Sequence, residues 1–208
     1  MKLMAYIALT GAVLCGVLRC VAGKYVFSAC MSILCACAVA ASGQTRLKLA
    51  LVAGLLISVA ADWFLAHQKG HSERFLHGVI GFFAAHCMFA WYAAMRFSFS
   101  MPALVIALAL LALYFVYMAL RILPGVEPGL KAPLMLYMLV SIASLYFAMS
   151  MQASAAEKAI YIAGIAAIVF SDTMIGENEF VGTQAAGRLV LPTYYLCHAL
   201  LALSALIR

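Results

Sequence analysis

The chain has 208 residues, of which 68% are hydrophobic and only 10% are charged. Soluble domains are usually about 45–50% apolar and about 25% charged, so no globular packing of this length would bury so much apolar surface. The composition excludes a soluble protein and predicts an integral, multi-pass membrane protein, in the cell inner membrane if the source is bacterial. The net charge of +6 is spread over the loops, which suits anionic lipid headgroups and not nucleic acid.

Apolar segments follow one another along the whole chain. A transmembrane helix needs about 20 predominantly apolar residues. The sequence therefore predicts one all-α membrane domain, residues 1–208, with eight transmembrane helices, at 3–20, 25–42, 49–67, 75–94, 102–120, 132–151, 159–176 and 189–207. The first segment has features of a signal peptide, but seven further apolar segments favour a retained helix. The longest loop is expected over residues 121–131.

Charge and cysteine content give little further information. Basic residues divide six against seven between the two sides of the predicted bundle, so the positive-inside rule leaves the orientation open. We call the side reached by the end of the first helix the far side. The seven cysteines are odd in number and lie almost entirely within apolar segments, which indicates small apolar residues and no disulfide framework or zinc motif.

Two of the seven acidic residues lie inside apolar segments. Asp62 lies 13 residues into the third predicted span, and Asp172 lies 13 residues into the seventh. An ionisable group at hydrocarbon depth costs at least roughly 2.5–3.5 kcal/mol on insertion scales, so it indicates function by default. Equal depth is what two groups acting on one bond need, and we expect both aspartates to be catalytic and to share one polar chamber. The alternative is a pair of neutral carboxyl groups that hold helices together.

Other polar side chains are predicted in the same layer, where they would orient substrate or water: Tyr137, Tyr194, His86, His198 and Ser58. Tyr194 and His198 share one helix face at i, i+4 spacing, whereas Tyr195 is expected to point elsewhere. Asp62 is followed by His86 after 24 residues, and Asp172 by His198 after 26. This weak echo suggests two four-helix halves, as in a parallel repeat.

The remaining polar residues are predicted near the far-side boundary. Tyr114, Tyr117 and Arg121 are expected to form an interfacial anchor. Glu177 and Glu179 are expected to be solvated loop acids, with a role at the site entrance as the alternative. Three histidines are expected to be exposed or to face headgroups: His67, His71 and His77.

At these residues the chain resembles the YhhN-like family of multi-pass membrane proteins, which includes the lysoplasmalogenases. The resemblance runs in order through residues 55–68 (LLISVAADWFLAHQ), 78–92 (GVIGFFAAHCMFAWY), Pro133 with Tyr137, 170–180 (FSDTMIGENEF) and 194–204 (YYLCHALLALS). The family's first aspartate usually follows glycine, where this chain has Ala61. The family's tyrosine pair is often followed by glutamine where this chain has His198, which leaves the role of His198 open.

The resemblance implies hydrolysis of the vinyl-ether bond of lysoplasmalogens, which releases a fatty aldehyde and glycerophospho-ethanolamine or -choline. A vinyl ether opens when its β-carbon is protonated and water captures the oxocarbenium ion, a task for one protonated carboxyl and one carboxylate. We take Asp62 as the acid and Asp172 as its ionised partner, with Arg74 and Arg188 holding the substrate phosphate. The expected partners are a lysophospholipid and membrane lipids, with no cofactor and with the oligomeric state open.

Two other functions are compatible with the same residues. A metal-dependent lipid hydrolase would bind zinc through four of them: Asp62, His86, Asp172 and His198. A proton-coupled transporter of a small amphiphile would also place carboxylates in the third and seventh helices. Such transporters favour helices broken by glycine or proline at the site, and these two segments contain no internal proline.

Overall fold

The computed structural model describes residues 2–43, 46–69 and 72–208, and these residues are almost entirely helical. Their eight α-helices are α1 (Lys2–Ala22), α2 (Tyr25–Ala41), α3 (Arg46–Ala66), α4 (Ser72–Ala94), α5 (Met101–Tyr117), α6 (Pro128–Ser150), α7 (Ala155–Gly176) and α8 (Gln184–Leu206). Three short helical segments lie between some of them: the π-helical η1 (Met118–Ile122) and the 3-10 helix η2 (Leu123–Gly125) between α5 and α6, and the π-helical η3 (Glu177–Val181) between α7 and α8. The prediction of an all-α fold is confirmed.

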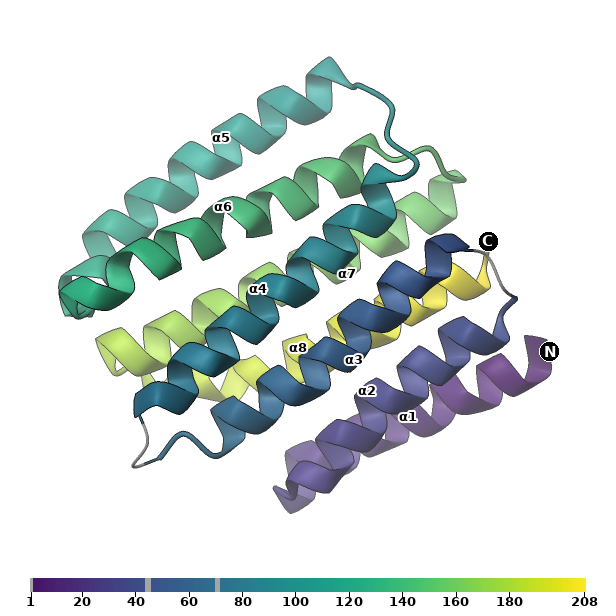
Figure 1. The fold of residues 1–208 in the computed structure, drawn as a ribbon, viewed down its shortest axis with the longest axis horizontal. Helices are drawn as coiled ribbons and strands as arrows, with labels where there is room; N and C mark the ends of the chain where they lie inside the picture. The colour runs from purple at the N-terminus through teal and green to yellow at the C-terminus, as the bar shows by residue number, and fades with distance from the viewer. Residues whose placement is uncertain (1, 44–45, 70–71) are drawn as a thin grey trace.

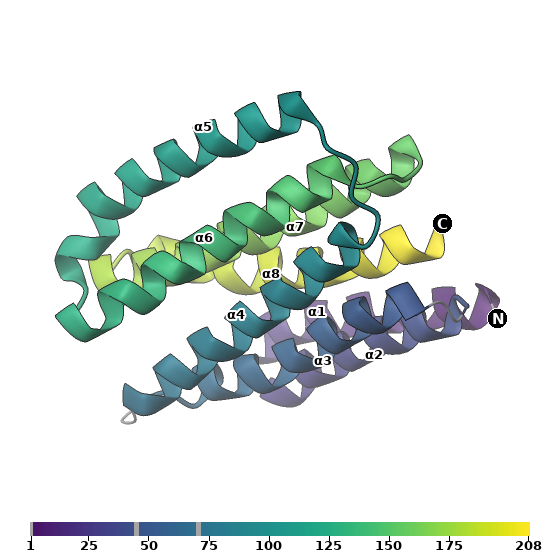
Figure 2. The ribbon, with the colours of Figure 1, turned by 45° about the horizontal axis from the view of Figure 1, so that its top comes forward.

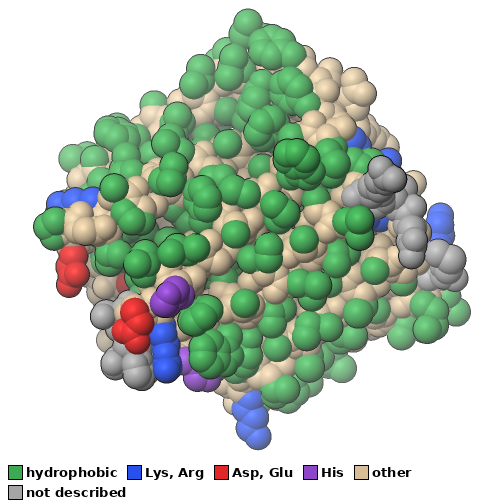
Figure 3. All heavy atoms as spheres, viewed as in Figure 1, with side chains coloured by type: hydrophobic (Ala, Val, Ile, Leu, Met, Phe, Trp, Pro, Cys, Tyr) green, Lys and Arg blue, Asp and Glu red, His purple; other side chains and the backbone are tan. Residues whose placement is uncertain are grey.

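Seven of these helices are long and apolar enough to cross a membrane, α5 because η1 and η2 continue it to Gly125, while α2, with 17 residues, is a shorter apolar helix. Large apolar side chains remain exposed along them, among them Leu3, Leu113 and Leu120. Figure 3 shows apolar side chains over most of one face, with charged residues gathered toward two opposite ends. This distribution is typical of a protein whose middle band faces hydrocarbon.

The helices run roughly side by side, and both chain ends lie at the same end of the bundle (Figure 1). Figure 2 shows α1–α4 on one side of the molecule and α5–α8 on the other, with α5 at the outer edge. Neighbours in sequence pack on one another except α4 and α5, which both pack on α6, and α8 packs on α1 and α2 as well as on α7. Because α4 packs on α6 and α8 on α1 and α2, packing continues between the two groups, and the two four-helix halves stay a prediction.

Most helices begin several residues before the predicted apolar spans, because their first turns are polar. Ser100 accepts a hydrogen bond from the amide of Ala103 at the start of α5, and Ser154 does the same for Glu157 in α7.

The prediction of a long loop over residues 121–131 is wrong. The chain there continues as η1 and η2, and α6 begins at Pro128, where a proline in the first helical turn lacks only an amide that would be unpaired anyway.

Helices α3 and α4 approach closely through glycines. A Cβ atom on Gly81 would lie 2.8 Å from the Cβ of Ala61, and one on Gly78 would lie 2.5 Å from a methyl group of Leu65. Small residues let helix backbones pack closely in lipid, where no hydrophobic force drives helices together. Because Ala61 precedes Asp62, the Gly81 contact sets where this aspartate lies relative to α4.

We expect Gly81→Val to destabilise the protein by about 1–3 kcal/mol, the usual cost of overpacking a tight core. The valine would push α3 from α4 at Ala61 and displace Asp62, so activity should fall together with the melting temperature in detergent. Gly129→Ala is the matched control, since a Cβ at Gly129 meets nothing within 4 Å of the described structure. An unchanged melting temperature for Gly81→Val would contradict the close packing.

Two buried glutamates join helices at opposite ends of the bundle. On the near side, Glu157 forms an ion pair of 2.5 Å with Arg96, which ties α7 to the end of α4. On the far side, Glu177 accepts hydrogen bonds from Tyr117 at 2.5 Å and Arg121 at 3.1 Å. Buried charges of this kind need partners. The expectation that Glu177 is a solvated loop acid is therefore wrong, and Tyr117 and Arg121 contact this glutamate and not only the interface.

The far-side histidines are partly placed as expected. His67 and His77 are exposed, and His67 stacks on Trp63 with ring centroids 4.8 Å apart. His71 lies outside the described residues.

Candidate active site

The two intramembrane aspartates line one cavity of about 190 Å³ near the far side, between α3, α7 and α8. Asp62 lies four residues before the last residue of α3, and Asp172 lies four residues before the last residue of α7. Both carboxyl groups are therefore about one helical turn from the ends of their helices. The expected common chamber is present, and the catalytic roles of the two residues stay a prediction.

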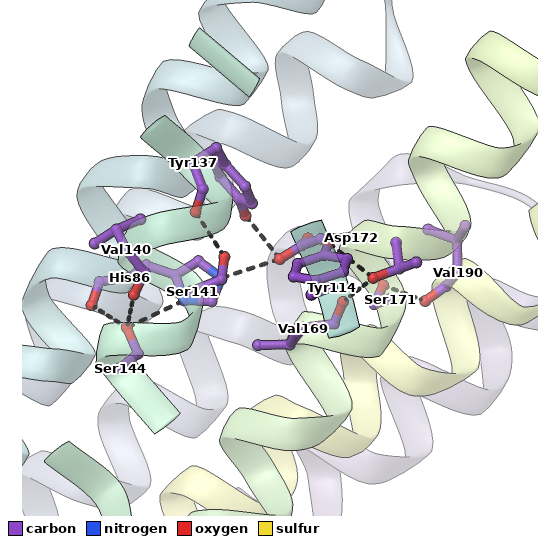
Figure 4. Close-up of polar contacts among 11 residues, drawn as sticks. His86, Tyr114, Tyr137, Val140, Ser141, Ser144, Val169, Ser171, Asp172 and Val190 are labelled. Atoms are coloured by element: carbon purple, nitrogen blue, oxygen red, sulfur yellow. Dashed lines mark hydrogen bonds and ion pairs between the residues drawn. The ribbon is translucent and has the colours of Figure 1, made fainter. Parts of the chain in front are cut away.

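Asp172 accepts two hydrogen bonds on the same carboxyl oxygen. The Tyr137 hydroxyl of α6 donates to Oδ2 at 2.7 Å, and Nε2 of His86 from α4 lies 3.0 Å from that oxygen (Figure 4). The neighbouring Ser171 donates to the Val190 carbonyl of α8 at 2.9 Å, which fixes the rotation of α7 at this point. Three helices thus hold one carboxyl group in a defined orientation.

His86 is fully buried and reaches the site through Asp172. Its Nδ1 lies 3.4 Å from the hydroxyl of Ser144, which itself donates to the Val140 carbonyl at 2.8 Å (Figure 4). When Asp172 is ionised, Nε2 has to carry a proton to make its hydrogen bond. His86 is not among the residues that line the cavity, so it positions Asp172 and does not touch a molecule in the chamber.

Asp62 has different surroundings. Its Oδ2 accepts a hydrogen bond from Ser28 of α2, and the Ser28 hydroxyl lies 2.7 Å from that of Tyr195 in α8. Tyr195 does not line the chamber, as expected from its different face of α8, but it reaches Asp62 indirectly through Ser28 of α2. Asp62 is thus tied to the N-terminal helices and Asp172 to α4 and α6.

Tyr194, Ser58 and His198 form a wall beside the chamber. Tyr194 lines it and donates to the Ser58 carbonyl at 3.2 Å, while the Ser58 hydroxyl bonds back to Gly54 of its own helix at 2.9 Å. His198 lies behind Tyr194, with ring centroids 4.3 Å apart, and its Nδ1 is 2.9 Å from the Ser32 hydroxyl. Ser58 and His198 therefore support Tyr194, and neither side chain contacts Asp62 in the described structure.

A second, apolar pocket of about 50 Å³ lies on the other side of Asp172. It shares Leu65, Phe82 and Ile175 with the polar chamber and extends between α4, α6 and η1. Tyr114 lines it and is 2.9 Å from the hydroxyl of Thr173 (Figure 4), so this tyrosine faces the site and not only the interface. Asp172 thus lies where a polar chamber meets an apolar pocket.

The arginines proposed for phosphate binding lie elsewhere. Arg74 donates to the His67 carbonyl at 2.9 Å and lies over the Trp63 ring, 5.7 Å from its centroid. Arg188 is exposed, and neither arginine lines the chamber. The arginine that does line it is Arg19, in the last turn of α1.

The zinc alternative required four side chains to converge. Asp172 and His86 are in contact, but His198 turns to Ser32 and Asp62 to Ser28. Across residues 2–43, 46–69 and 72–208, no three His, Cys, Asp or Glu side chains are grouped as metal ligands. The four-ligand site of this alternative is therefore absent from the described residues.

Sequence reasoning missed three residues of the site: Ser28, Tyr195 and Arg19. Ser28 and Ser32 were visible as a polar pair at i, i+4 in an otherwise apolar helix, which places both on one face. No spacing signal identified Arg19, because it resembles the other boundary arginines.

Comparison with known proteins gives one match. A model of the YhhN family matches residues 23–205, which is most of the chain from α2 to α8. No curated protein and no solved structure matches the chain. The matched residues include both aspartates, His86, Tyr137 and Tyr194, but not Arg19.

Proposed function

The chain belongs to the YhhN family, and on that premise we propose that it is a membrane-embedded hydrolase for the vinyl-ether bond of lysoplasmalogens. The observation that carries this proposal is the pair of aspartates from α3 and α7, which line one chamber but have different hydrogen-bond partners. Two carboxyl groups in different surroundings can divide acid and base roles between them.

The hydrogen bonds support Asp172 as the ionised member of the pair. Its ionised form is the one that uses the donors of both Tyr137 and His86. Ser28 is the one side chain of the described residues that hydrogen-bonds to Asp62, and a hydroxyl can also accept a hydrogen bond from a protonated carboxyl. We therefore assign Asp62 as the proton donor.

The reaction proceeds in balanced steps. Asp62 gives its proton to the β-carbon of the vinyl ether, and the electron pair of the double bond forms the new C–H bond, leaving an oxocarbenium ion. Asp172 stabilises this cation and takes a proton from the water that attacks it. The resulting hemiacetal breaks its bond to the glycerol oxygen, which takes the proton held by Asp172, while the hemiacetal hydroxyl gives its proton to Asp62. The fatty aldehyde is released, and both carboxyl groups return to their starting states.

The apolar pocket beside Asp172 supports a lipid substrate. The alkenyl chain begins at the reacting bond, so a chain that leaves Asp172 enters this pocket between α4, α6 and η1. Met138 lines both this pocket and a groove of about 460 Å³ between α5 and α6. This groove is almost entirely apolar, since its lining includes Leu108, Phe115 and Leu139, and it provides a route for the chain toward the bilayer.

We also propose that α2 crosses the membrane, which gives the eight spans expected from the sequence. Arg19 at the end of α1 and Asp62 near the end of α3 line the same chamber, so α1 and α3 end on the same side. The helix between them has to return the chain to the other side. Its 17 residues span about 26 Å against about 30 Å of hydrocarbon, a small mismatch.

The test is incubation of the purified protein in D₂O with a panel of lysophospholipids that carry alkenyl, acyl or alkyl chains. We expect aldehyde from the alkenyl lipid alone, with one deuterium on the carbon next to the carbonyl, because a fixed acid delivers a solvent-derived proton there. Release of fatty acid from the acyl lipid would overturn the vinyl-ether assignment. Uptake of the lipid into proteoliposomes without any product would favour a transporter.

A further inference from the structure

The chamber that holds both aspartates is also lined by two charged side chains that the reaction does not use, Arg19 and Glu179. Arg19 lines this chamber from the last turn of α1, close enough to Asp62 to interact with it electrostatically. We propose that Arg19 forms an anion subsite that binds the phosphate group of the lysophospholipid headgroup. The identity of the ligand rests on the proposed function, whereas the subsite itself rests on the residues around Arg19.

The side chain of Arg19 has N–H donors available for a ligand. A guanidinium group carries five N–H donors in a fixed fork that matches the geometry of a phosphate. One donor of Arg19, on Nη1, is used by the Gly23 carbonyl at the end of its own helix. Its Nε atom is buried and has no hydrogen-bond partner within the described part of the chain. A buried donor without a partner costs free energy unless a ligand or water satisfies it.

The rest of the rim is polar and includes one acid, Glu179, which accepts a hydrogen bond from Asn178 at 3.0 Å. Gln68 and Asn178 line the chamber beside Arg19, and the side-chain oxygen of Gln68 is buried without a partner among the described residues. Asn178 comes close to α8 because residue 187 is glycine, where a Cβ atom would lie 2.6 Å from the Asn178 side-chain oxygen. Phosphate oxygens would accept from Arg19, and a glycerol hydroxyl would donate to Gln68.

Arg19 and the two aspartates lie at similar depths. Arg19 lies three residues before the end of α1, each aspartate lies four residues before the end of its own helix, and all three line one chamber. In a lysophospholipid the phosphate is the outer group and the ether bond lies on the chain side of the glycerol. Binding of the phosphate at Arg19 would therefore hold the ether bond in the same chamber as Asp62 and Asp172, with the chain leading on to the apolar pocket.

The experiment measures binding with ligands that the proposed reaction cannot cleave. One ligand is a saturated 1-alkyl lysophosphoethanolamine, and the other is the 1-alkylglycerol with the same chain and no phosphate. Wild type, Arg19→Gln, Arg19→Lys and Arg188→Gln are compared as full-length proteins in detergent. We expect Arg19→Gln to bind the phospholipid at least about tenfold more weakly, as for loss of a hydrogen bond to a charged group, and the alkylglycerol unchanged.

Arg19→Lys should retain part of the affinity, and the exposed Arg188→Gln should match wild type. Inorganic phosphate serves as a competitor: displacement of the phospholipid from wild type but not from Arg19→Gln supports the anion subsite and shows that free phosphate also occupies it. Equal weakening for both ligands, or no weakening for either, overturns the proposal. Because no cleavage is measured, failure of the vinyl-ether reaction appears separately, as missing aldehyde with the binding difference intact.

Discussion

Asp172→Asn is expected to lower the rate of aldehyde release from a lysoplasmenyl lipid by about 10²–10⁴-fold, the range typical of a lost acid–base group. The change removes the negative charge that faces the oxocarbenium ion and the base that activates water. Asparagine has nearly the same shape and keeps an oxygen that can accept from Tyr137 or His86, whose groups lie 2.7 and 3.0 Å from the carboxyl group. Folding should therefore be preserved, so the melting temperature is measured together with the rate.

The matched control for Asp172→Asn is Glu127→Gln. Glu127 is an exposed acid that precedes α6 on the far side and does not line the chamber. Glu127→Gln removes the same charge from the same side of the protein and should leave the rate of aldehyde release unchanged. Full activity of Asp172→Asn, with normal folding, would remove this residue from the mechanism.

Asp62→Asn is expected to reduce aldehyde release by a similar factor for a different reason. An amide cannot give a proton to the β-carbon, so the first step loses its acid. The contact with Ser28 can persist, because an asparagine oxygen also accepts from a hydroxyl. The affinity of Asp62→Asn for an uncleavable alkyl lysophospholipid should therefore stay close to that of wild type, while its rate of aldehyde release falls.

The outcome that separates a chemical from a structural role is the ratio of these two measurements. If Asp62→Asn weakened binding as much as turnover, Asp62 would be shaping the chamber and not delivering a proton. Ser204→Ala serves as the control, since Ser204 is a buried polar residue of α8 that bonds only to the Leu201 carbonyl, at 2.7 Å, in the described structure. This variant should change neither measurement.

Two features of the sequence were sufficient by themselves. The long apolar segments determined the fold class, and the position of each acid within them identified the two candidate catalytic aspartates. Both signals are local, because the cost of placing a charge in hydrocarbon depends on depth along one helix and not on its neighbours. The eight helices, seven of them long and apolar enough to cross a membrane, follow from that information, and the shared chamber agrees with the equal depth of the two aspartates. Membership of the YhhN family, shown over residues 23–205, agrees with the same motifs.

The tertiary structure alone decided which side chain meets each aspartate. Helices such as α3 and α6 are apolar on all faces, so no amphipathic stripe reveals how each is rotated about its axis. The rotation is set by close contacts such as that of Gly81 with Ala61 and by bonds such as that of Ser171 with Val190. These contacts place His86 against Asp172 and Ser28 against Asp62. The packing of α1 on α8 brings Arg19 to the chamber, and no residue spacing in the sequence encodes that position.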